Sequence, residues 1–405
     1  MARAFRLLRV AGLIASGALA SCGGGGGGTS AMPQPASSPQ SANKTAQVLF
    51  TIQIPRKASA HNRTPQYVSA STASVTLSVT PHGGGGTTSN SAACTGPTCS
   101  VSVQAPIGAD DFKIQTFDSN ATPNLLSSGS LSNFTVVQGV LNTFNVTFNP
   151  VVATLQLSGG TTLPTDVAGG GTMNAIALDA DGNTIVGPGN FVDANLTPIT
   201  LTLTENDSET PTRITITSPN TVTAPGAGQA MNYTYSGSTV STQDAAPVTF
   251  TLAATGNTTG IVNATAQVAF LRVIHIQPQT AITCDAVSCG YTAVANGASA
   301  VEFNEPVGVQ IEFVNDDTVN PRTEGGFGSG GFPASFAAGN ATCTPGTPSG
   351  STISGAWCTG NLAVSGGTST LITLDTAGTW YFGDFTYYTG VPPGGSSVGS
   401  DIVAH

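Results

Sequence analysis

From residue 45 onward, apolar residues alternate with polar ones in run after run of the chain. The first run places Val48, Phe50, Ile52 and Ile54 between polar neighbours. Such alternation puts one face of an extended strand on a core and the other face in water. The same period recurs in runs that begin at Val75, Val101, Phe144, Ile199, Met231, Val248, Val307 and Trp380. Because Thr is abundant within the runs and Gly, Pro, Asn and Asp gather between them, we predict short antiparallel strands joined by turns.

The shortage of charge excludes the main alternatives to a β fold. Charged side chains make up 8% of the 405 residues, against ~25% in ordinary soluble domains. Long amphipathic helices need charged residues on their solvated faces, so all-α and coiled-coil folds are excluded. The 21 acidic and 11 basic residues give a net charge of −10. Since phosphate binding needs clustered cations, nucleic acid is excluded as a natural partner.

The strands fall into three blocks. The boundaries lie near residues 44–150, 151–271 and 272–389, and each block has the usual size of one β-sandwich. Residues 390–405 are rich in Pro, Gly and Ser, and we interpret them as a flexible tail. The expected fold is therefore all-β, with two to three tandem sandwiches of the immunoglobulin-like or transthyretin-like kind.

The amino terminus has the features of an export signal. Three arginines precede an apolar run over 10–20, which is too short to span a bilayer as a mature helix. Leu19-Ala20-Ser21-Cys22 resembles the lipobox of bacterial lipoproteins. The resemblance implies that residues 1–21 are removed as a signal peptide and that the thiol of Cys22 carries the lipid. The alternative is a plain secretory signal whose mature chain contains a cysteine.

The lipobox also implies a location. It places the protein in a bacterial cell envelope, held at a membrane by lipid, and Gly23 favours the outer membrane or cell surface over retention at the inner membrane. Residues 22–43 then contain the lipidated cysteine, six glycines and a Pro/Ser/Gln-rich stretch, which predicts a flexible tether. No Lys follows the glycines, so they are not a phosphate-binding loop.

The second block carries a family resemblance. The segment LDADGNTIVG, residues 178–187, resembles the strand–hairpin–strand unit of bacterial immunoglobulin-like domains of the invasin and intimin type. In that comparison Asp181-Gly182-Asn183 form the turn, where Gly supplies the positive φ that a tight hairpin requires. The resemblance implies spacer and binding modules rather than catalysts. For the first block a transthyretin-like sandwich remains an alternative.

The same hairpin offers a candidate metal site. Asp179 and Asp181 present oxygen ligands spaced like the start of a calcium loop. The distal Glu of such a loop is absent, and the hairpin already accounts for Asp181, so calcium is the lesser interpretation.

Six cysteines remain besides Cys22, and an even number in an exported chain predicts disulfides. Proximity favours three local pairs: Cys94–Cys99, Cys284–Cys289 and Cys343–Cys358. The alternative is a four-thiolate zinc site, which the C-x₄-C spacing and the oxidising compartment disfavour.

The sequence contains no recognised catalytic motif. No His lies in HExxH, no Ser in G-x-S-x-G and no Lys after a glycine-rich loop. Acidic residues cluster at 205–209, 302–305 and 316–324, where solvated turns are the simple interpretation and a pair of catalytic carboxylates is the alternative. We therefore expect no cofactor and no enzymatic activity.

Aromatic residues gather late in the third block. Alternation puts Trp380 and Phe382 on a core face, which leaves Tyr381, Tyr387 and Tyr388 as a candidate outward platform for a sugar or a protein. The preferred hypothesis is a lipid-anchored surface protein with an adhesive, structural or scaffolding role and a glycan or protein ligand. A carbohydrate-binding or carbohydrate-active lipoprotein, with its site in the third block, is the second. A filament subunit that donates the 44–54 strand is the third.

Overall fold

The structure, a computed structural model, describes residues 44–55, 67–225, 229–237, 244–255, 260–284, 288–297, 302–390 and 398–405, and Lys44–His405 form one compact unit. Six β-sheets occupy this part of the chain. The predicted all-β, multi-domain fold of the sandwich type is confirmed. The expectations for residues 1–43, which include the lipobox and the tether, lie outside the described residues.

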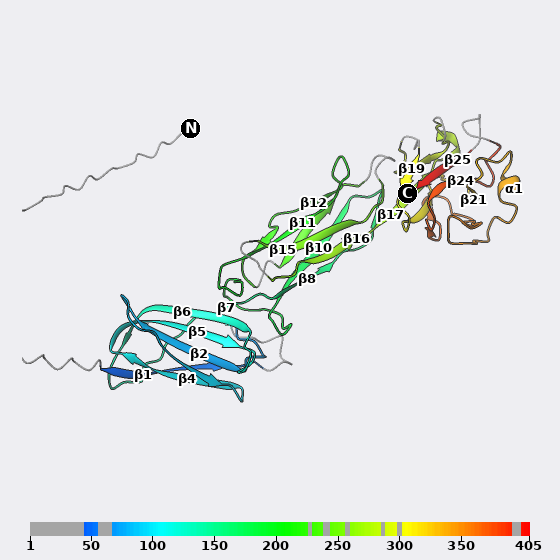
Figure 1. Ribbon diagram of the computed structural model, residues 1–405. Coiled ribbons are helices and arrows are strands. Elements are labelled where there is room, and N and C mark those ends of the chain that lie inside the picture. Colours follow the sequence, from blue (N-terminus) through cyan, green and yellow to red (C-terminus); the bar gives the residue numbers. More distant parts are fainter. Residues whose placement is uncertain are drawn as a thin grey trace, which may run out of the picture. The chain divides into compact units, whose positions relative to one another are not determined.

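The first sandwich packs a two-stranded sheet against a five-stranded sheet (Figure 1). The small sheet pairs β1 (Thr45–Gln53) with β4 (Thr98–Pro106) over nine residues. The large sheet has the order β3 (Thr88–Ala93), β2 (Ser74–Pro81), β5 (Gly108–Phe117), β6 (Leu125–Val136) and β7 (Asn149–Pro150). Val48, Phe50 and Ile52 all face the core, as their alternation predicts. Strand β1 pairs with β4 within its own chain, so it is an edge strand of a two-stranded sheet rather than a free donor strand.

The second sandwich contains two four-stranded antiparallel sheets, drawn in green in Figure 1. One sheet has the order β12 (Ile214–Ile216), β14 (Ala230–Tyr235), β10 (Gly169–Leu178) and β8 (Thr154–Gly159). The other has the order β13 (Thr221–Val222), β11 (Thr200–Glu205), β15 (Val248–Thr255) and β16 (Ala264–Val268). The turn predicted after Leu178 is present, with Gly182 at a φ of 76°. Beyond it, Ile185 is held by a single backbone hydrogen bond rather than in a regular strand.

The third sandwich mixes parallel and antiparallel pairs. Its first sheet has the order β18 (Tyr291–Thr292), β17 (Phe270–Ile276), β20 (Gln310–Asn315) and β22 (Gly367–Thr368), with β23 (Ile372–Thr373) on β20 and β9 (Leu163–Pro164) on β17. Its second sheet has the order β19 (Phe303–Glu305), β25 (Gly399–Ala404), β24 (Gly378–Asp384) and β21 (Glu324–Gly328). The described helical segments are η1 (Gln279–Ala281) and α1 (Phe336–Gly339).

Two features of this sandwich differ from the sequence-based expectation. Strand β17 runs parallel to β20, and β19 runs parallel to β25, whereas antiparallel pairs alone are predicted. The boundary at 271/272 is also wrong, because β17 crosses it. Phe270 packs in the core of the second sandwich, while Ile274 and Ile276 pack in the third. A continuous apolar strand can serve two cores, which the division into blocks does not foresee.

The predicted flexible tail is wrong for Gly399–Ala404. These residues form β25, which lies between β19 and β24 in the middle of a sheet. Ile402 is fully buried, and Ala404 is 4% exposed. The strand escapes recognition because only a short apolar run, Ile402-Val403-Ala404, follows a long stretch of Gly, Ser and Pro. Residues 391–397 of the predicted tail lie outside the described residues.

The six cysteines form the three predicted disulfides. The Cα atoms lie 5.0 Å apart in Cys94–Cys99, 4.1 Å in Cys284–Cys289 and 5.2 Å in Cys343–Cys358. The thiolates are therefore committed to sulfur–sulfur bonds, which overturns the zinc alternative. The pairing fits an extracytoplasmic protein, because such bonds persist in oxidising compartments.

Candidate functional site

The three tyrosines predicted as an outward platform are packed against other side chains to different degrees. Tyr388 is 5% exposed and its hydroxyl donates to the carbonyl oxygen of Pro333 at 2.7 Å. Tyr387 stacks beneath the guanidinium of Arg322, 4.1 Å from the ring centroid. Tyr381 meets the ring of Phe332 edge to face. The prediction of an outward platform is thus wrong for Tyr388, which is buried, while Tyr381 and Tyr387 are half-buried.

The candidate calcium ligands do not converge. Asp179 is 1% exposed, and its Oδ2 accepts hydrogen bonds from the hydroxyls of Tyr67 at 2.7 Å and Ser69 at 2.5 Å. Its Oδ1 accepts the backbone N–H groups of Asp181 and Asn183, while the side chain of Asp181 is exposed. The carboxylate of Asp179 therefore organises the hairpin turn and joins it to the 67–69 segment. Within the described residues, no group of three His, Cys, Asp or Glu side chains is placed to hold a metal.

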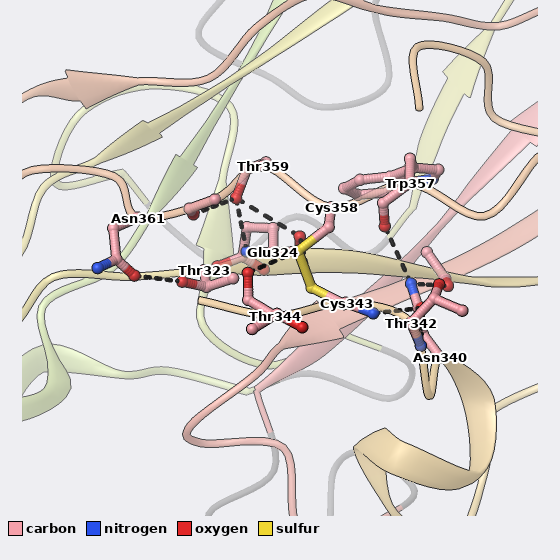
Figure 2. The surroundings of a disulfide bond; sticks show 12 residues. Thr323, Glu324, Asn340, Thr342, Cys343, Thr344, Trp357, Cys358, Thr359 and Asn361 are labelled. Atoms are coloured by element: carbon pink, nitrogen blue, oxygen red, sulfur yellow. Dashed lines mark hydrogen bonds between the residues drawn. A yellow bond between two sulfur atoms is a disulfide. The ribbon is translucent and has the colours of Figure 1, made fainter. Parts of the chain in front are cut away.

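A polar framework surrounds the disulfide Cys343–Cys358. Figure 2 shows Asn340 to the right of the disulfide and below Trp357. The amide nitrogen of Asn340 donates to the carbonyl oxygens of Gly326 and Trp357, and its oxygen accepts the backbone N–H of Cys343. This one side chain therefore ties α1, β21 and the disulfide loop together. A Cβ on Gly326 would lie 2.2 Å from the indole nitrogen of Trp357, so that position requires glycine.

Next to this framework, the third sandwich encloses a cluster of charged side chains that we call the acidic cluster: Asp317, Arg322, Glu324 and Asp384, with Tyr291. Nη2 of Arg322 donates to Asp317 at 2.9 Å and Nη1 donates to Asp384 at 3.4 Å. The hydroxyl of Tyr291 donates to Oε2 of Glu324. Glu324 and Asp384 lie directly opposite one another on β21 and β24.

Burial determines the protonation of this cluster. Desolvation, followed by the neighbouring charge of Asp384, raises the pKa of Glu324 well above its ordinary value. Desolvation also raises the pKa of Asp384, although Arg322 opposes that shift. The pKa of Tyr291 is raised as well, by burial and then by Glu324. Burial therefore disfavours the charged form of Glu324, while Arg322 is shared between Asp317 and Asp384.

The acidic cluster lacks the access that catalysis requires. A hydrolytic carboxylate pair must face a cleft that admits substrate and water between the two groups. The side chains of Arg322 and Asp384 are 0% exposed and that of Asp317 is 3% exposed, and Glu324 is fully buried. The arrangement is thus a structural network that links two strands and a loop. In this structure its side chains are closed to a substrate.

A second set of charges lies where β17 passes from one sandwich to the next. The ring of His275 is held between Asp166, at 3.1 Å from Nε2, and Asp316, at 2.9 Å from Nδ1. Burial lowers the pKa of His275, but the hydrogen bonds and charges of the two carboxylates outweigh it and raise the pKa to about 9. Nearby, Arg272 pairs with Glu305, whose Oε2 accepts the backbone N–H of Ala245 at 2.7 Å. These contacts fix the junction rather than form an open site.

An open groove of about 650 Å³ lies on the first sandwich. It is lined by outward residues of β2, β5 and β6, which are mostly Ser, Thr and Gln with one Lys and one Asp. Sequence reasoning missed it, although the signal is present: the polar positions of these strands carry hydroxyl and amide groups where most proteins carry charges. The interpretation of 316–324 as a solvated turn is wrong for Asp317 and Glu324, which are buried. The sequence analysis does not foresee Arg322 or Asp384, because Arg322 lies in a stretch that has the composition of a loop.

Comparisons with known proteins leave the family open. No protein-family model and no curated protein matches the chain. Among solved structures, the three N-terminal domains of the outer capsid protein Hoc of bacteriophage RB49 match with a TM-score of 0.19 and 8% identity, over 82% of this chain and 88% of that chain. Salmonella alpha-2-macroglobulin matches with a TM-score of 0.20 and 9% identity, over 88% and 23%. The β-glucuronidase of Parabacteroides merdae matches with a TM-score of 0.18 and 9% identity, over 49% and 21%, so this chain spans about a fifth of that enzyme.

Proposed function

We propose that this chain is a lipid-anchored protein of a bacterial cell envelope, at the outer membrane or cell surface. Its sandwiches serve there as non-enzymatic adhesion, structural or scaffolding modules, of the kind that bacterial immunoglobulin-like repeats provide. Cys22 carries the lipid, and residues 23–43 are the tether. The three disulfides support an extracytoplasmic location. None of the described helices is long and apolar enough to cross a membrane.

One observation carries the non-enzymatic part of this proposal. The acidic cluster is closed to solvent, and its arginine is committed to two carboxylates. Catalytic groups need perturbed pKa values and access to substrate together. Here the raised pKa of Glu324 comes with full burial. The buried cluster therefore fits a structural role in the sandwich better than a role in hydrolysis.

The anchor is tested by metabolic labelling. The full chain is expressed in a Gram-negative host that is fed an alkyne fatty acid, and the envelope is fractionated. We expect label on the wild type and none on Cys22→Ala, which should lose its membrane attachment because the acylated thiol is missing. Ser21→Ala is the matched control, since it keeps a small residue before the cysteine and should label normally. Label that persists on Cys22→Ala, or a wild type found free in the medium, would contradict the proposal.

The location and role are tested on whole cells. Brief protease treatment of intact cells should remove the sandwiches if they face the medium, and a periplasmic marker should survive as the control. Lys44–His405 form a compact unit, so this fragment is also suited to an array of glycans and matrix proteins. Binding to at least one class supports adhesion. Uniform absence of binding, with surface exposure intact, would leave the scaffolding role and remove the adhesive one.

A further inference from the structure

The groove on the first sandwich is built from a regular array of outward side chains. Ser78 of β2, Lys113 of β5 and Ser130 of β6 are paired across the three strands and form one row. Gln115 and Ser128 form the next row. Neighbouring strands lie ~4.8 Å apart, and residues two apart on a strand lie ~6.7 Å apart. The groove of about 650 Å³ therefore presents polar groups at the spacing of the sheet itself.

The side chains in these two rows have unused hydrogen-bonding capacity. Within the described residues, the side chains of these two rows form no hydrogen bond to the protein, although their backbones pair in the sheet: Ser78, Lys113, Gln115, Ser128 and Ser130. Ser128 is the most informative of them, because it is 7% exposed and lines the groove without a protein partner. Such a hydroxyl can donate one hydrogen bond to a ligand and accept others from it.

The groove side chains that already form hydrogen bonds within the protein hold the rim of the groove in place. Oδ1 of Asp111 accepts hydrogen bonds from the hydroxyl of Ser132 at 2.6 Å and the backbone N–H of Asn133 at 2.8 Å. These bonds lower the pKa of Asp111 to about 2, so its carboxylate stays charged. The hydroxyls of Thr80 and Thr87 lie 2.8 Å apart and pair with each other. The rim is thus organised before any ligand arrives, which reduces the entropy cost of binding.

The composition of the groove selects a class of ligand. Lys113 and Asp111 lie two residues apart on the same face of β5, so their charges balance and an anionic ligand gains little. The remaining free groups are neutral donors and acceptors. Leu196, from a turn of the second sandwich, lines the groove as an apolar surface. Neutral hydroxyl and amide groups beside an apolar wall match a sugar ring, which has hydroxyls at its edge and C–H groups on its face.

We infer that this groove binds a neutral glycan, with its ring hydroxyls on Lys113, Gln115 and the serines, and its C–H face against Leu196. The volume lies within the ~300–1,000 Å³ of ordinary small-molecule sites. The inference rests on the adhesive role proposed above, and it moves the glycan site from the third sandwich to the first. Display of many anchored copies on one surface would strengthen a weak individual site through avidity.

The test uses the soluble Lys44–His405 unit, so that failure of the anchor leaves it unaffected. A panel of neutral glucan, mannan and galactan oligosaccharides is screened, and the best binder is titrated by calorimetry. Sulfated and uronic-acid oligosaccharides are included in the panel. Lys113→Ala/Gln115→Ala should weaken binding of the neutral oligosaccharide at least about tenfold, since two hydrogen-bonding side chains are removed.

The matched control is Gln47→Ala/Thr51→Ala. These residues are equally polar and exposed but lie on the outer face of β1, where they bond to Ser102 and Ser100. This variant should bind like the wild type. Ser130→Tyr, which fills the groove from an exposed position, is a second blocking variant if the first does not fold. Binding of acidic oligosaccharides alone, binding unaffected by both groove variants, or no neutral oligosaccharide bound at all would overturn the inference.

Discussion

The first and third sandwiches place their polar side chains differently: the first mainly on its sheet faces, the third partly in its interior. The first has a core of aliphatic residues and packed phenylalanines, among them Phe50, Phe112 and Phe144. Its sheet faces carry neutral hydroxyl pairs such as Thr51–Ser100 and Thr76–Ser91. The third encloses the acidic cluster between its strands. Outward side chains of the first sandwich that lie outside these pairs, such as Lys113 and Ser130, are open to solvent, whereas the charged groups of the acidic cluster bond to one another inside the fold.

The difference shows how a chain with so few charges uses them. Buried ion pairs seldom add net stability over apolar packing, but removing one partner is severely destabilising because the other charge stays buried alone. The third sandwich therefore depends on correct pairing at single residues. The first depends on distributed apolar contacts, where Asp110 is the buried carboxyl among the described residues of its strands. Matched substitutions in the two sandwiches test this contrast.

The largest effect is expected from Arg322→Met. The substitution keeps much of the apolar stem but leaves Asp317 and Asp384 without their cation. We expect the third sandwich to lose about 3–5 kcal/mol of unfolding free energy. Both tryptophans, Trp357 and Trp380, lie in its core, so urea unfolding followed by tryptophan fluorescence measures this sandwich specifically. Lys113→Met, on the open face of β5 in the first sandwich, is the control. Its stability, measured by hydrogen exchange of the first-sandwich strands in urea, should change by no more than about 0.5 kcal/mol. Equal losses in the two variants would remove the contrast.

A smaller effect is expected from the disulfides. Cys343–Cys358 close a loop with a separation of 15 residues, and Cys94–Cys99 close one with a separation of 5. Loop-closure entropy predicts losses of about 3 kcal/mol for Cys343→Ala/Cys358→Ala and about 2 kcal/mol for Cys94→Ala/Cys99→Ala. Hydrogen exchange in urea, read separately for the strands of each sandwich, measures both. A larger loss in the first sandwich would show that its hairpin end matters more than loop length indicates.

The smallest effect on stability is expected from the titration of His275. His82, which lies at a similar distance from a carboxylate, serves as the comparison. His275 lies 2.9 Å from Asp316 and is nearly buried, whereas His82 lies 2.9 Å from Asp111 with 45% of its side chain exposed. The pKa of His275 is raised from 6.5 to about 9. Its contribution to stability is therefore complete below pH 6.5 and is lost as the pH rises through about 9.

We expect the stability of the wild type to fall by about 1–2 kcal/mol over that window, after allowance for the solvent contact of the two carboxylates. His275→Gln should remove this dependence, and His82→Gln should leave it unchanged. Urea midpoints at pH 6.5, 7.5 and 9 measure the effect. A pH profile that His275→Gln does not alter would show that other groups titrate at the junction.

The sequence predicts the first sandwich better than the third. In the first sandwich alternation marks β1, β2 and β4, as in Val75, Leu77 and Val79, and the disulfides follow from proximity. The predicted strand at Phe144 is wrong, because residues 143–148 form no regular strand, and β5 and β6 are not foreseen. In the third, Arg322 and Glu324 are buried although their residue types predict solvent, and β25 is hidden behind glycines. Alternation reports which face is buried only when polar side chains stay outside. A network that satisfies charges internally breaks that relation, and the parallel pairing of β17 with β20 depends on contacts far apart in the chain.

Strand β17 has a mechanical consequence. Phe270 packs in the core of the second sandwich and Ile274 in the core of the third. Only three residues of β17 separate these two buried positions. A tensile load on an anchored chain would pass along this backbone with no slack to absorb it, and neither sandwich could extend before strand contacts on both sides began to shear. For anyone preparing the sandwiches as separate fragments, a cut at 271/272 would sever the element that each of them needs.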